Sequence, residues 1–400
     1  MALPALLRDT LSIPVVGAPL FIVSNPDLVI EQCKVGIIGA FPALNARPKE
    51  MLEEWLKRIT SELAEYKARH PEKKVAPFAV NQIVHSSNDR LQHDVDLCEK
   101  YKVPIQITSL RAPDDVVKSA HTYGCLVFHD VTNVTHAKRA LQAGVDGLIL
   151  VCAGAGGHAG RLSPFALVPE VRQFYDGCIL LSGSIANGAS VLAAQAMGAD
   201  LAYLGTRFIA SKEAAATDGN KQCIIDSSGE EIIYTNLFTG VHGNYLKRSV
   251  AAAGLDPEAL PEADKSKMNF GSGGNSKAKA WRDIWGAGQG VGQIFFRPAR
   301  RRDRGAPESR IRRRPLSPLR RRDRADPAQA GGGVIKPFSS SKSFLPHQMG
   351  EVPEGRRGTL SKRFVPIPLR PYGPPPPCDE GGIPILGSHP LVLCNAAVAC

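Results

Sequence analysis

A histidine within a run of small residues is the feature of this sequence that most clearly suggests chemistry. Residues 153–160 read AGAGGHAG, so Gly156 and Gly157 directly precede His158. A backbone of this kind can lie close against a flat ligand. An imidazole titrates near neutral pH, which suits a general base. We therefore expect His158 to be catalytic, with Gly156 and Gly157 beside the ligand. The alternative is a flexible loop that carries an incidental histidine.

Two short turns combine glycine with hydroxyl side chains. Ser182-Gly183-Ser184 and Gly205-Thr206 each end an apolar run, and helical patterns follow over Asn187–Met197 and Phe208–Ala215. Backbone N–H groups at such turns, and the positive end of a helix dipole, favour an anion. The pair of turns predicts a phosphate site, and two ordinary tight turns are the alternative.

Eight short apolar runs alternate with amphipathic segments and must position these residues. Fully apolar runs are typical of parallel strands that are buried on both faces. Eight strand–helix units fit an α/β fold of the closed (β/α)8 TIM-barrel type. An open doubly wound sheet is the alternative, although the GxGxxG turn that it usually carries is missing after the first run. The runs begin near Pro14, Gly36, Ala76, Val103, Cys125, Gly147, Cys178 and Leu201.

The rim formed by the carboxyl ends of barrel strands carries the chemistry in such enzymes. The fifth run ends near His129, the other histidine at a strand end, and we expect it on the substrate side. Residues 212–285 follow the eighth run. We expect them to cap this rim with loops and with helices over Asn244–Gly254 and Ser276–Trp285, around the glycine-rich piece Phe270–Asn275.

The net charge of +11 belongs to the end of the chain. Residues 295–400 contain 20 Lys+Arg and 8 Asp+Glu, whereas residues 1–294 contain 29 and 30. Thirteen Arg and no Lys lie between Arg297 and Arg324, and 17 of the 31 prolines lie beyond residue 294. Such a composition cannot bury enough apolar surface to fold. We expect a folded domain in residues 1–294 and a disordered tail in residues 295–400.

Two interpretations of this tail remain open. It could be an arm that binds nucleic acid or a protein partner. It could also be the product of an altered reading frame or a gene-model junction. We favour the second interpretation, because the composition switches between adjacent residues, arginine occurs without lysine, and no aromatic residues are interleaved. We therefore do not expect nucleic acid as a partner.

Several other classes of protein are excluded. No run approaches the roughly 18 apolar residues of a membrane-spanning helix, and the first residues lack the pattern of a secretory signal. The nine cysteines show no paired spacing, and neither CxxC…CxxC nor HExxH occurs. We expect no metal site and a cytoplasmic protein in a reducing environment.

Several short segments within residues 10–294 resemble the nitronate monooxygenase family, formerly called 2-nitropropane dioxygenases. The members of this family are FMN-dependent barrels. No single segment is diagnostic, but the ordered set is specific. The matching segments are Ala18-Pro19-Leu20, Pro77–Asn81, Ala155–Gly160, Ser182–Gly188, Met197–Asp200, Gly205–Phe208 and Ala287-Gly288-Gln289.

The resemblance implies a role for each segment. The first two would contact the flavin, the two glycine turns would hold its phosphate, and the histidine would face its ring. His129 and Gln289 would lie on the substrate side. The residues that would bind the cofactor are Ala18, Pro19, Leu20, Asn81, Gly156, Gly157, Ser182, Gly183, Ser184, Gly205 and Thr206.

The sequence also departs from the family pattern. Leu20 stands where the family usually has Met, Ala159 replaces a common Arg, and Gly154-Ala155 lacks the usual Glu. These three changes surround the substrate side. Ser184 replaces a Gly and Asn187 an Asp near the phosphate. The identity of the substrate is therefore less defined than flavin binding.

The resemblance implies an FMN-dependent oxidation of alkyl nitronates by O2, which yields a carbonyl compound and nitrite. The flavin would accept an electron from the nitronate, and O2 would enter at the radical stage. The alternative on the same scaffold is a flavin-dependent enoyl-acyl-carrier or quinone reductase that consumes NAD(P)H. The sequence leaves the physiological substrate and the oligomeric state open.

Overall fold

The computed structural model describes residues 3–263 and 283–294. All of them belong to one compact unit of the chain, which extends over Met1–Pro307. The expected tail over residues 295–400, the glycine-rich piece Phe270–Asn275 and most of the expected helix Ser276–Trp285 lie outside the described residues.

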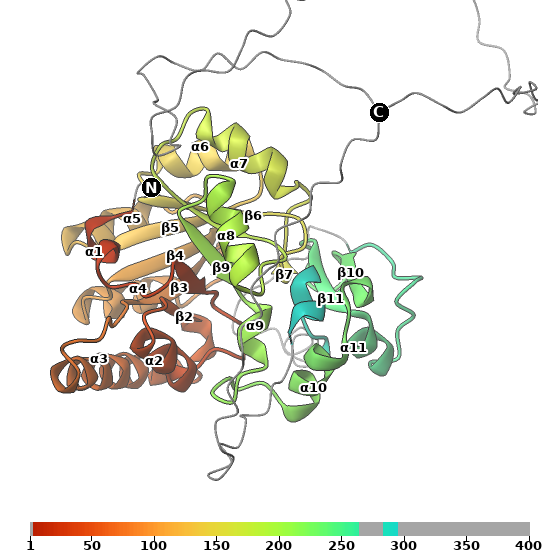
Figure 1. The fold of residues 1–400 in the computed structure, drawn as a ribbon, viewed down its shortest axis with the longest axis horizontal. Coiled ribbons are helices and arrows are strands. Elements are labelled where there is room, and N and C mark those ends of the chain that lie inside the picture. Colours follow the sequence, from red (N-terminus) through yellow and green to blue (C-terminus); the bar gives the residue numbers. More distant parts are fainter. Residues whose placement is uncertain (1–2, 264–282, 295–400) are drawn as a thin grey trace, which may run out of the picture. The chain divides into compact units, whose positions relative to one another are not determined.

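Eight parallel strands form one sheet that closes on itself. They neighbour one another in the order β1-β9-β8-β6-β5-β4-β3-β2. A parallel bridge between Val16 and Ile38 joins β1 to the residues just before β2. The two edges of the sheet therefore meet, and the expected (β/α)8 barrel is confirmed (Figure 1). The strands are β1 Val15–Gly17, β2 Gly39–Pro42, β3 Phe78–Val84, β4 Ile105–Leu110, β5 Leu126–Val131, β6 Gly147–Val151, β8 Cys178–Ser182 and β9 Leu201–Leu204.

A helix follows each barrel strand and covers the outside of the sheet (Figure 1). Asn25, Asn133 and Asn187 begin three of these helices, because each side-chain oxygen accepts a backbone N–H of the first turn. None of the described helices combines the length and the apolar character that a bilayer crossing requires. The helices are α1 Ala5–Arg8, α2 Pro26–Lys34, α3 Met51–Arg69, α4 Leu91–Lys100, α5 Asp114–Thr122, α6 Val134–Gln142, α7 Pro164–Arg172, α8 Gly188–Ala196 and α9 Thr206–Ile209.

Alternate residues of each strand divide the barrel core into two layers. On β5, Phe128 packs in the cluster that fills the barrel, together with Ile105 and Ile107 of β4. Val127 and Val131 of β5 instead pack in the cluster under the helices. Successive side chains on a strand point to opposite faces, so the phase of each strand decides which residues reach the interior.

A small antiparallel sheet lies beside the barrel. It consists of β10 Ile232–Thr235, β11 Gly243–Leu246 and β7 Gly157–His158. The helices α10 Asp218–Asp226 and α11 Lys247–Ala252 flank it. The sequence-based prediction of loops and helices alone was therefore wrong, and the helix expected from Asn244 begins only at Lys247.

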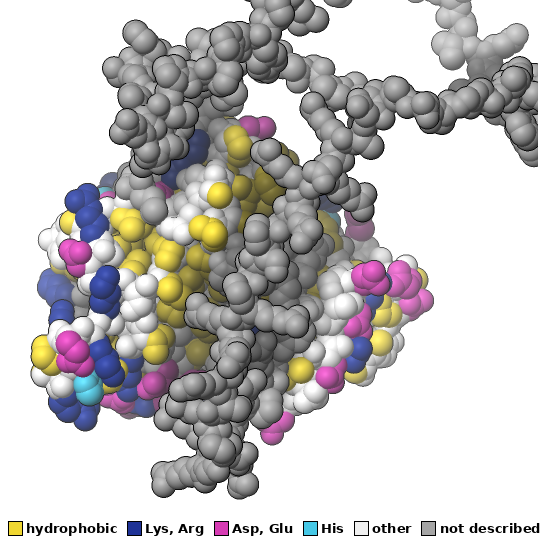
Figure 2. Space-filling model, viewed as in Figure 1, with side chains coloured by type: hydrophobic (Ala, Val, Ile, Leu, Met, Phe, Trp, Pro, Cys, Tyr) yellow, Lys and Arg dark blue, Asp and Glu magenta, His cyan; other side chains and the backbone are white. Residues whose placement is uncertain are grey.

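Figure 2 shows charged side chains of both signs toward the two sides of this face, with hydrophobic side chains between them. Asp256, Glu258 and Glu262, on the segment that follows α11, are exposed. This distribution agrees with the near-neutral balance of residues 1–294.

Candidate active site

The carboxyl ends of β8 and β9 meet at a small pocket. Its cavity volume is about 20 Å³. A single water needs roughly 10–15 Å³ of such a cavity, so the pocket has room for only a small group. The lining residues are small and come from segments far apart in the sequence: Gly154, Ala155, Gly156, Ser182, Gly183, Ser184, Ile185, Ala186, Tyr203, Gly205, Thr206, Gly288 and Gly290.

The lining offers hydrogen-bond donors and contains no carboxylate. Thr206 Oγ1 accepts the Gly288 N–H at 2.9 Å, which leaves the hydroxyl hydrogen to donate to another group. The Gly154 carbonyl accepts the N–H groups of Ser184 at 3.2 Å and Gln289 at 2.9 Å. A neutral, donor-rich lining fits the phosphate that the resemblance implies, because the anion meets no like charge.

Two glycines keep this pocket open. Gly183 has φ +140°, and a Cβ there would lie 2.8 Å from the Ala153 carbonyl oxygen. Gly154 has φ +81°, and a Cβ there would lie only 2.1 Å from Ser184 Oγ. Both positions therefore favour glycine, because a side chain there would combine a positive φ with a collision against neighbouring protein atoms.

The helix dipoles contribute less to this pocket than the sequence suggested. The start of α8 is already satisfied, since Asn187 Oδ1 accepts the Ser190 N–H and Ser190 Oγ accepts the Asn187 N–H. The second helix, expected over Phe208–Ala215, is instead the single turn Thr206–Ile209. For the phosphate that the resemblance implies, the turns themselves would have to provide most of the binding.

The end of β1 borders the same turns. The Ala18 N–H donates to the Leu204 carbonyl at 2.8 Å. A Cβ built on Gly205 would lie 3.1 Å from Leu20 Cδ2 and 3.7 Å from Ala18 Cβ. The segment Ala18-Pro19-Leu20 thus lies beside the Gly205-Thr206 turn.

The Asn45 side chain fixes the loop that follows. Its Oδ1 accepts the Ile22 N–H at 2.9 Å, and its Nδ2 donates to the carbonyls of Leu20 at 2.9 Å and Ser24 at 2.8 Å. Ile22 has φ +58°, a conformation that a β-branched residue rarely adopts. Three hydrogen bonds from one side chain therefore hold a strained loop at the rim.

Polar side chains of β3, β4 and β5 form a chain across the inside of the barrel rim. Asn81 Nδ2 donates to the Ile107 carbonyl at 3.2 Å and to Ser109 Oγ at 3.0 Å. Ser109 Oγ in turn donates to Asp130 Oδ2 at 2.7 Å. The other carboxylate oxygen, Asp130 Oδ1, is buried and has no hydrogen-bond partner among the described residues.

Asp130 is the residue at this rim that sequence reasoning missed. Burial raises the pKa of its carboxyl from 3.8 to about 6, against the lowering effect of the Ser109 hydrogen bond. Burial also raises the pKa of Tyr203, and the charge of Asp130 raises it further. Tyr203 lines the pocket, so the carboxylate acts on a pocket residue across the barrel interior.

The structure places His129 away from this chain. Its Nδ1 lies 2.8 Å from Thr108 Oγ1. Burial lowers its pKa to about 4, and His136 on α6 adds to the effect. His129 thus points toward the helix layer, on the opposite face of β5 from Asp130, and does not lie on the substrate side as we expected.

The structure brings Gln289 next to Gly154 of the pocket wall. Its Oε1 lies 2.9 Å from the position that a Cβ on Gly154 would take. It belongs to the turn η4 Gln289–Gln293, which closes one wall of the pocket.

His158 lies on β7, where its loop meets the small sheet. Its Nε2 lies 3.0 Å from Thr239 Oγ1. The Thr239 hydroxyl donates to the Val241 carbonyl at 3.0 Å, so it accepts from the imidazole, and we assign the ring proton to Nε2. Burial lowers the pKa of His158 to about 4. The imidazole is therefore neutral at pH 7 but is a weaker base than the near-neutral group that the sequence suggested.

The small sheet holds the His158 loop in place. Asn244 Nδ2 donates to the Ala155 carbonyl at 2.6 Å, and Tyr234 OH donates to the Ala159 carbonyl at 2.9 Å. The Ala159 N–H donates to the His242 carbonyl at 3.1 Å. These bonds on both sides of His158 argue against a flexible loop with an incidental histidine.

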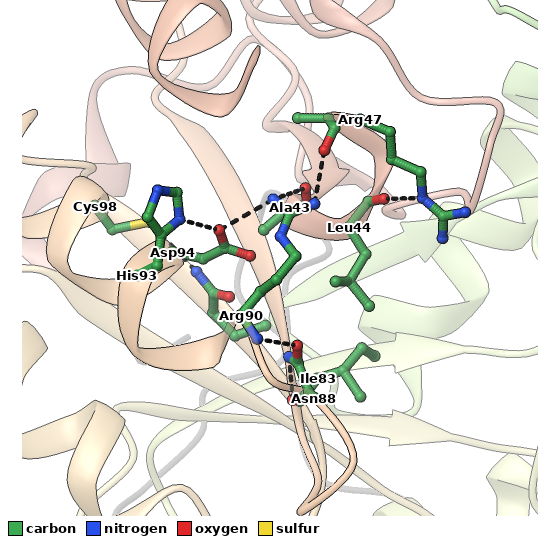
Figure 3. A network of polar contacts seen from close by, with 11 residues as sticks. Ala43, Leu44, Arg47, Ile83, Asn88, Arg90, His93, Asp94 and Cys98 are labelled. Carbon is green, nitrogen blue, oxygen red and sulfur yellow. Dashed lines mark hydrogen bonds and ion pairs between the residues drawn. The ribbon is translucent and has the colours of Figure 1, made fainter. Parts of the chain in front are cut away.

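Figure 3 shows a buried ion pair that supports the rim from outside. Arg90 Nη2 lies 3.0 Å from Asp94 Oδ1, and the Asp94 side chain is 0% exposed. The same guanidinium donates to the carbonyls of Ala46 at 2.7 Å and Ala43 at 3.3 Å. These carbonyls belong to the loop with the turn η1 Ala43–Asn45. Arg90 therefore ties α4 to the loop that presents Asn45.

A second hollow lies between α2, α3 and the residues that follow α9. Its cations are already paired, Arg58 with Asp27 and Glu62, and Lys212 with Glu213. It brings together none of the site residues expected from the sequence: it is lined by Asp27, Ile30, Glu31, Arg58, Glu62, Lys212 and Glu213.

Residues 7–260, which include all eight barrel strands and the small sheet, match the model of the family described as nitronate monooxygenase. The barrel, with its polar groups gathered at the carboxyl rim, is therefore that of a flavin-type oxidoreductase. Within that class, the chain belongs to the nitronate monooxygenase family. The resemblance noted from the sequence is confirmed.

Individual relatives agree with this assignment. The chain is 25% identical to the nitronate monooxygenase of Paraburkholderia phytofirmans over 323 residues, which cover 67% of this chain and 86% of that protein. The structure of a nitroalkane oxidase from Streptomyces ansochromogenes aligns with a TM-score of 0.59 at 23% identity, over 72% of this chain and 93% of that one. FabK from Thermotoga maritima aligns with a TM-score of 0.58 at 22% identity, over 73% and 90%. The two structural likenesses show the fold alone.

Proposed function

We propose that this chain binds FMN and uses it to oxidise alkyl nitronates with O2, giving a carbonyl compound and nitrite. The observation that carries the proposal is the neutral pocket formed by the Ser182-Gly183-Ser184 and Gly205-Thr206 turns. Hydroxyl and N–H donors without a carboxylate suit a phosphate ester. Membership of the nitronate monooxygenase family supports the reaction.

The proposed roles divide the rim into two parts. The two turns, with Gly156 beside them, would hold the phosphate, and Ala18, Pro19, Leu20 and Asn81 would contact the ring. Bound FMN would supply the electron acceptor that no protein side chain provides. The chain's own residues would bind the substrate, orient it and exclude water.

We propose His158 as the proton acceptor for a substrate that arrives as a neutral nitroalkane. Thr239 Oγ1, 3.0 Å from Nε2, fixes the orientation of the ring. The low pKa of about 4 keeps the imidazole unprotonated at pH 7, so it is available as a base, though a weak one. A nitronate has already lost this proton and would need His158 for binding only.

The alternative is an NAD(P)H-dependent enoyl-acyl-carrier or quinone reductase on the same barrel. The likeness to FabK, with a TM-score of 0.58, is as close as that to the nitroalkane oxidase, with 0.59. The fold therefore does not separate the two reactions.

One experiment tests both functions. The purified protein is supplemented with FMN, freed of excess cofactor and mixed without O2 with either a nitronate or NADH. We expect the nitronate to bleach the flavin absorbance and NADH to leave it unchanged. Bleaching by NADH alone would establish the reductase. A folded protein that never retains FMN would refute the cofactor assignment.

A further inference from the structure

The hydrogen bonds of Asn81 fix which of its atoms can meet a ligand. The Ile107 carbonyl can only accept, so the group that faces it at 3.2 Å must be Nδ2. The second hydrogen of Nδ2 goes to Ser109 Oγ at 3.0 Å. Both amide hydrogens are therefore committed within the protein. Asn81 can offer only its carbonyl oxygen to a ligand, which suits a ligand that presents an N–H group.

The bond to Ser109 depends on the state of Asp130. Ser109 Oγ can accept from Asn81 because its own hydrogen goes to Asp130 Oδ2 at 2.7 Å. A proton on Oδ2 would turn that oxygen into a donor toward Ser109. The serine hydrogen would then lose its acceptor and compete with the Asn81 hydrogen.

We propose that Asp130 is a positioning residue that, through Ser109, holds the Asn81 carbonyl oxygen toward the flavin, and that this hold weakens when Asp130 takes up a proton. The inference rests on the proposed FMN site and assigns a regulating group to it. Asp130 does not need to touch the cofactor, because it acts through two hydrogen bonds.

The surroundings of Asp130 make this titration accessible. Its carboxyl is buried, and burial raises its pKa to about 6. Tyr203 on β9 is the titratable group that responds to its charge from the opposite side of the barrel. The other strands present uncharged groups to the interior, namely Asn81 on β3, Ser109 on β4, Ile149 and Val151 on β6 and Leu180 on β8.

The test compares FMN binding by the full chain and its variants between pH 5 and pH 8, followed by quenching of flavin fluorescence. The FMN phosphate itself titrates near pH 6. This effect is common to all variants, so it cancels in the ratio of their dissociation constants. Loss of one hydrogen bond to the ligand corresponds to about a tenfold loss in affinity.

We expect Asp130→Asn to bind FMN like the unchanged protein at pH 8 and about tenfold more tightly than it at pH 5. The reason is that the asparagine Oδ1 accepts the Ser109 hydrogen at every pH. Ser109→Ala should bind about tenfold more weakly at pH 8, with no further loss when Asp130→Asn is added. A merely structural role would give neither the pH effect nor this non-additivity.

His129→Asn is the matched control, since it removes a titrating group one residue away on the other face of β5. It should leave the pH profile unchanged. Identical pH profiles for Asp130→Asn and the unchanged protein, or additive losses in the double variant, would overturn the inference while the FMN site stands. If Asp130→Asn does not fold, the pH profile of Ser109→Ala decides, because it should also lack the loss at pH 5. Absence of FMN binding by the unchanged protein would overturn both proposals.

Discussion

At the scale of single residues, Asp130 makes the folded state sensitive to pH. Burial raises its pKa from 3.8 to about 6, so the folded protein binds this proton more tightly than the unfolded chain. The stability gained from this tighter proton binding is fully present below pH 3.8 and is lost as the pH rises through about 6.

Asp130→Asn should therefore raise the free energy of unfolding at pH 8 by about 1–3 kcal/mol. At pH 4 the two proteins should differ much less. Urea unfolding at both pH values measures this. A variant that is less stable than the parent at pH 8 would show that the carboxylate is better satisfied than its unpartnered oxygen implies.

His158 leads to a kinetic prediction. His158→Asn should lower kcat/KM for a neutral nitroalkane by about 10²-fold, the low end for a general base, because its pKa lies far below neutrality. It should lower kcat/KM for the corresponding nitronate much less. For the parent enzyme, protonation of His158 should not affect kcat/KM for the nitroalkane above pH 4. Below its pKa of about 4, His158 becomes protonated and kcat/KM should fall. Equal losses on both substrates would leave His158 as a binding residue.

The sequence revealed His158 but not Asp130, and the reason is physical. The residues around His158 in 153–160 are all Gly or Ala, so His158 is the one residue of this run whose side chain can transfer a proton. His129 and Asp130 are adjacent on a strand that is apolar on both faces. In such a strand, the pattern of polar and apolar residues does not show which alternate residues face the barrel interior. Only the packing of Phe128 inside the barrel shows that Asp130 shares its face.

At the scale of elements, the Arg90 ion pair couples α4 to the loop after β2. Arg90→Met would leave the carboxylate of the fully buried Asp94 without its arginine, next to the His93 ring nitrogen at 2.9 Å. Removing one member of a buried pair costs roughly 3–5 kcal/mol. We expect a loss of about 3 kcal/mol in the free energy of unfolding.

The matched variant replaces both partners. Arg90→Met with Asp94→Leu should recover most of that stability, because no charge remains buried without a partner. FMN affinity should still fall in the double variant, since the carbonyls of Ala43 and Ala46 lose the guanidinium that holds the rim loop. Failure to recover the stability in urea unfolding, or full FMN affinity of the double variant in a titration, would contradict the coupling.

All eight barrel strands lie where the apolar runs predicted them, because buried parallel strands leave a local signal. The small sheet left a weaker signal. Ile232–Thr235 is rich in strand-forming residues and forms β10, which sequence reasoning missed. Gly243 and Asn244 have poor strand propensity, and they join β11 by pairing with β10 and with β7, which lies more than 80 residues earlier.

At the scale of the whole molecule, the folded unit should not need residues 295–400. The last described residue, Ile294, is buried, and the strand ends and pocket lie entirely before it. Truncation after Ile294 should leave FMN binding and turnover unchanged. If turnover disappears while stability is retained, the tail is functional, and our interpretation of it as a junction artefact is wrong.

The matched comparison is a form of the chain that ends earlier. Ending the chain after Asp283 removes Gly288, which donates to Thr206, and Gln289, which donates to Gly154. It also removes the buried Val291. FMN affinity should fall sharply, by at least tenfold per lost contact to the pocket wall. Full affinity in this form would show that the last turn is dispensable.

The position of that last wall has a consequence for how the enzyme is made. The pocket combines residues from Gly154 to Gly290, so a growing polypeptide lacks the phosphate cradle until Gly290 has left the ribosome. The barrel strands are complete much earlier, when β9 ends at Leu204. At roughly 5–20 residues per second, the segment from there to Gly290 takes several seconds to synthesise. The strands can therefore assemble before the last wall of the cradle exists.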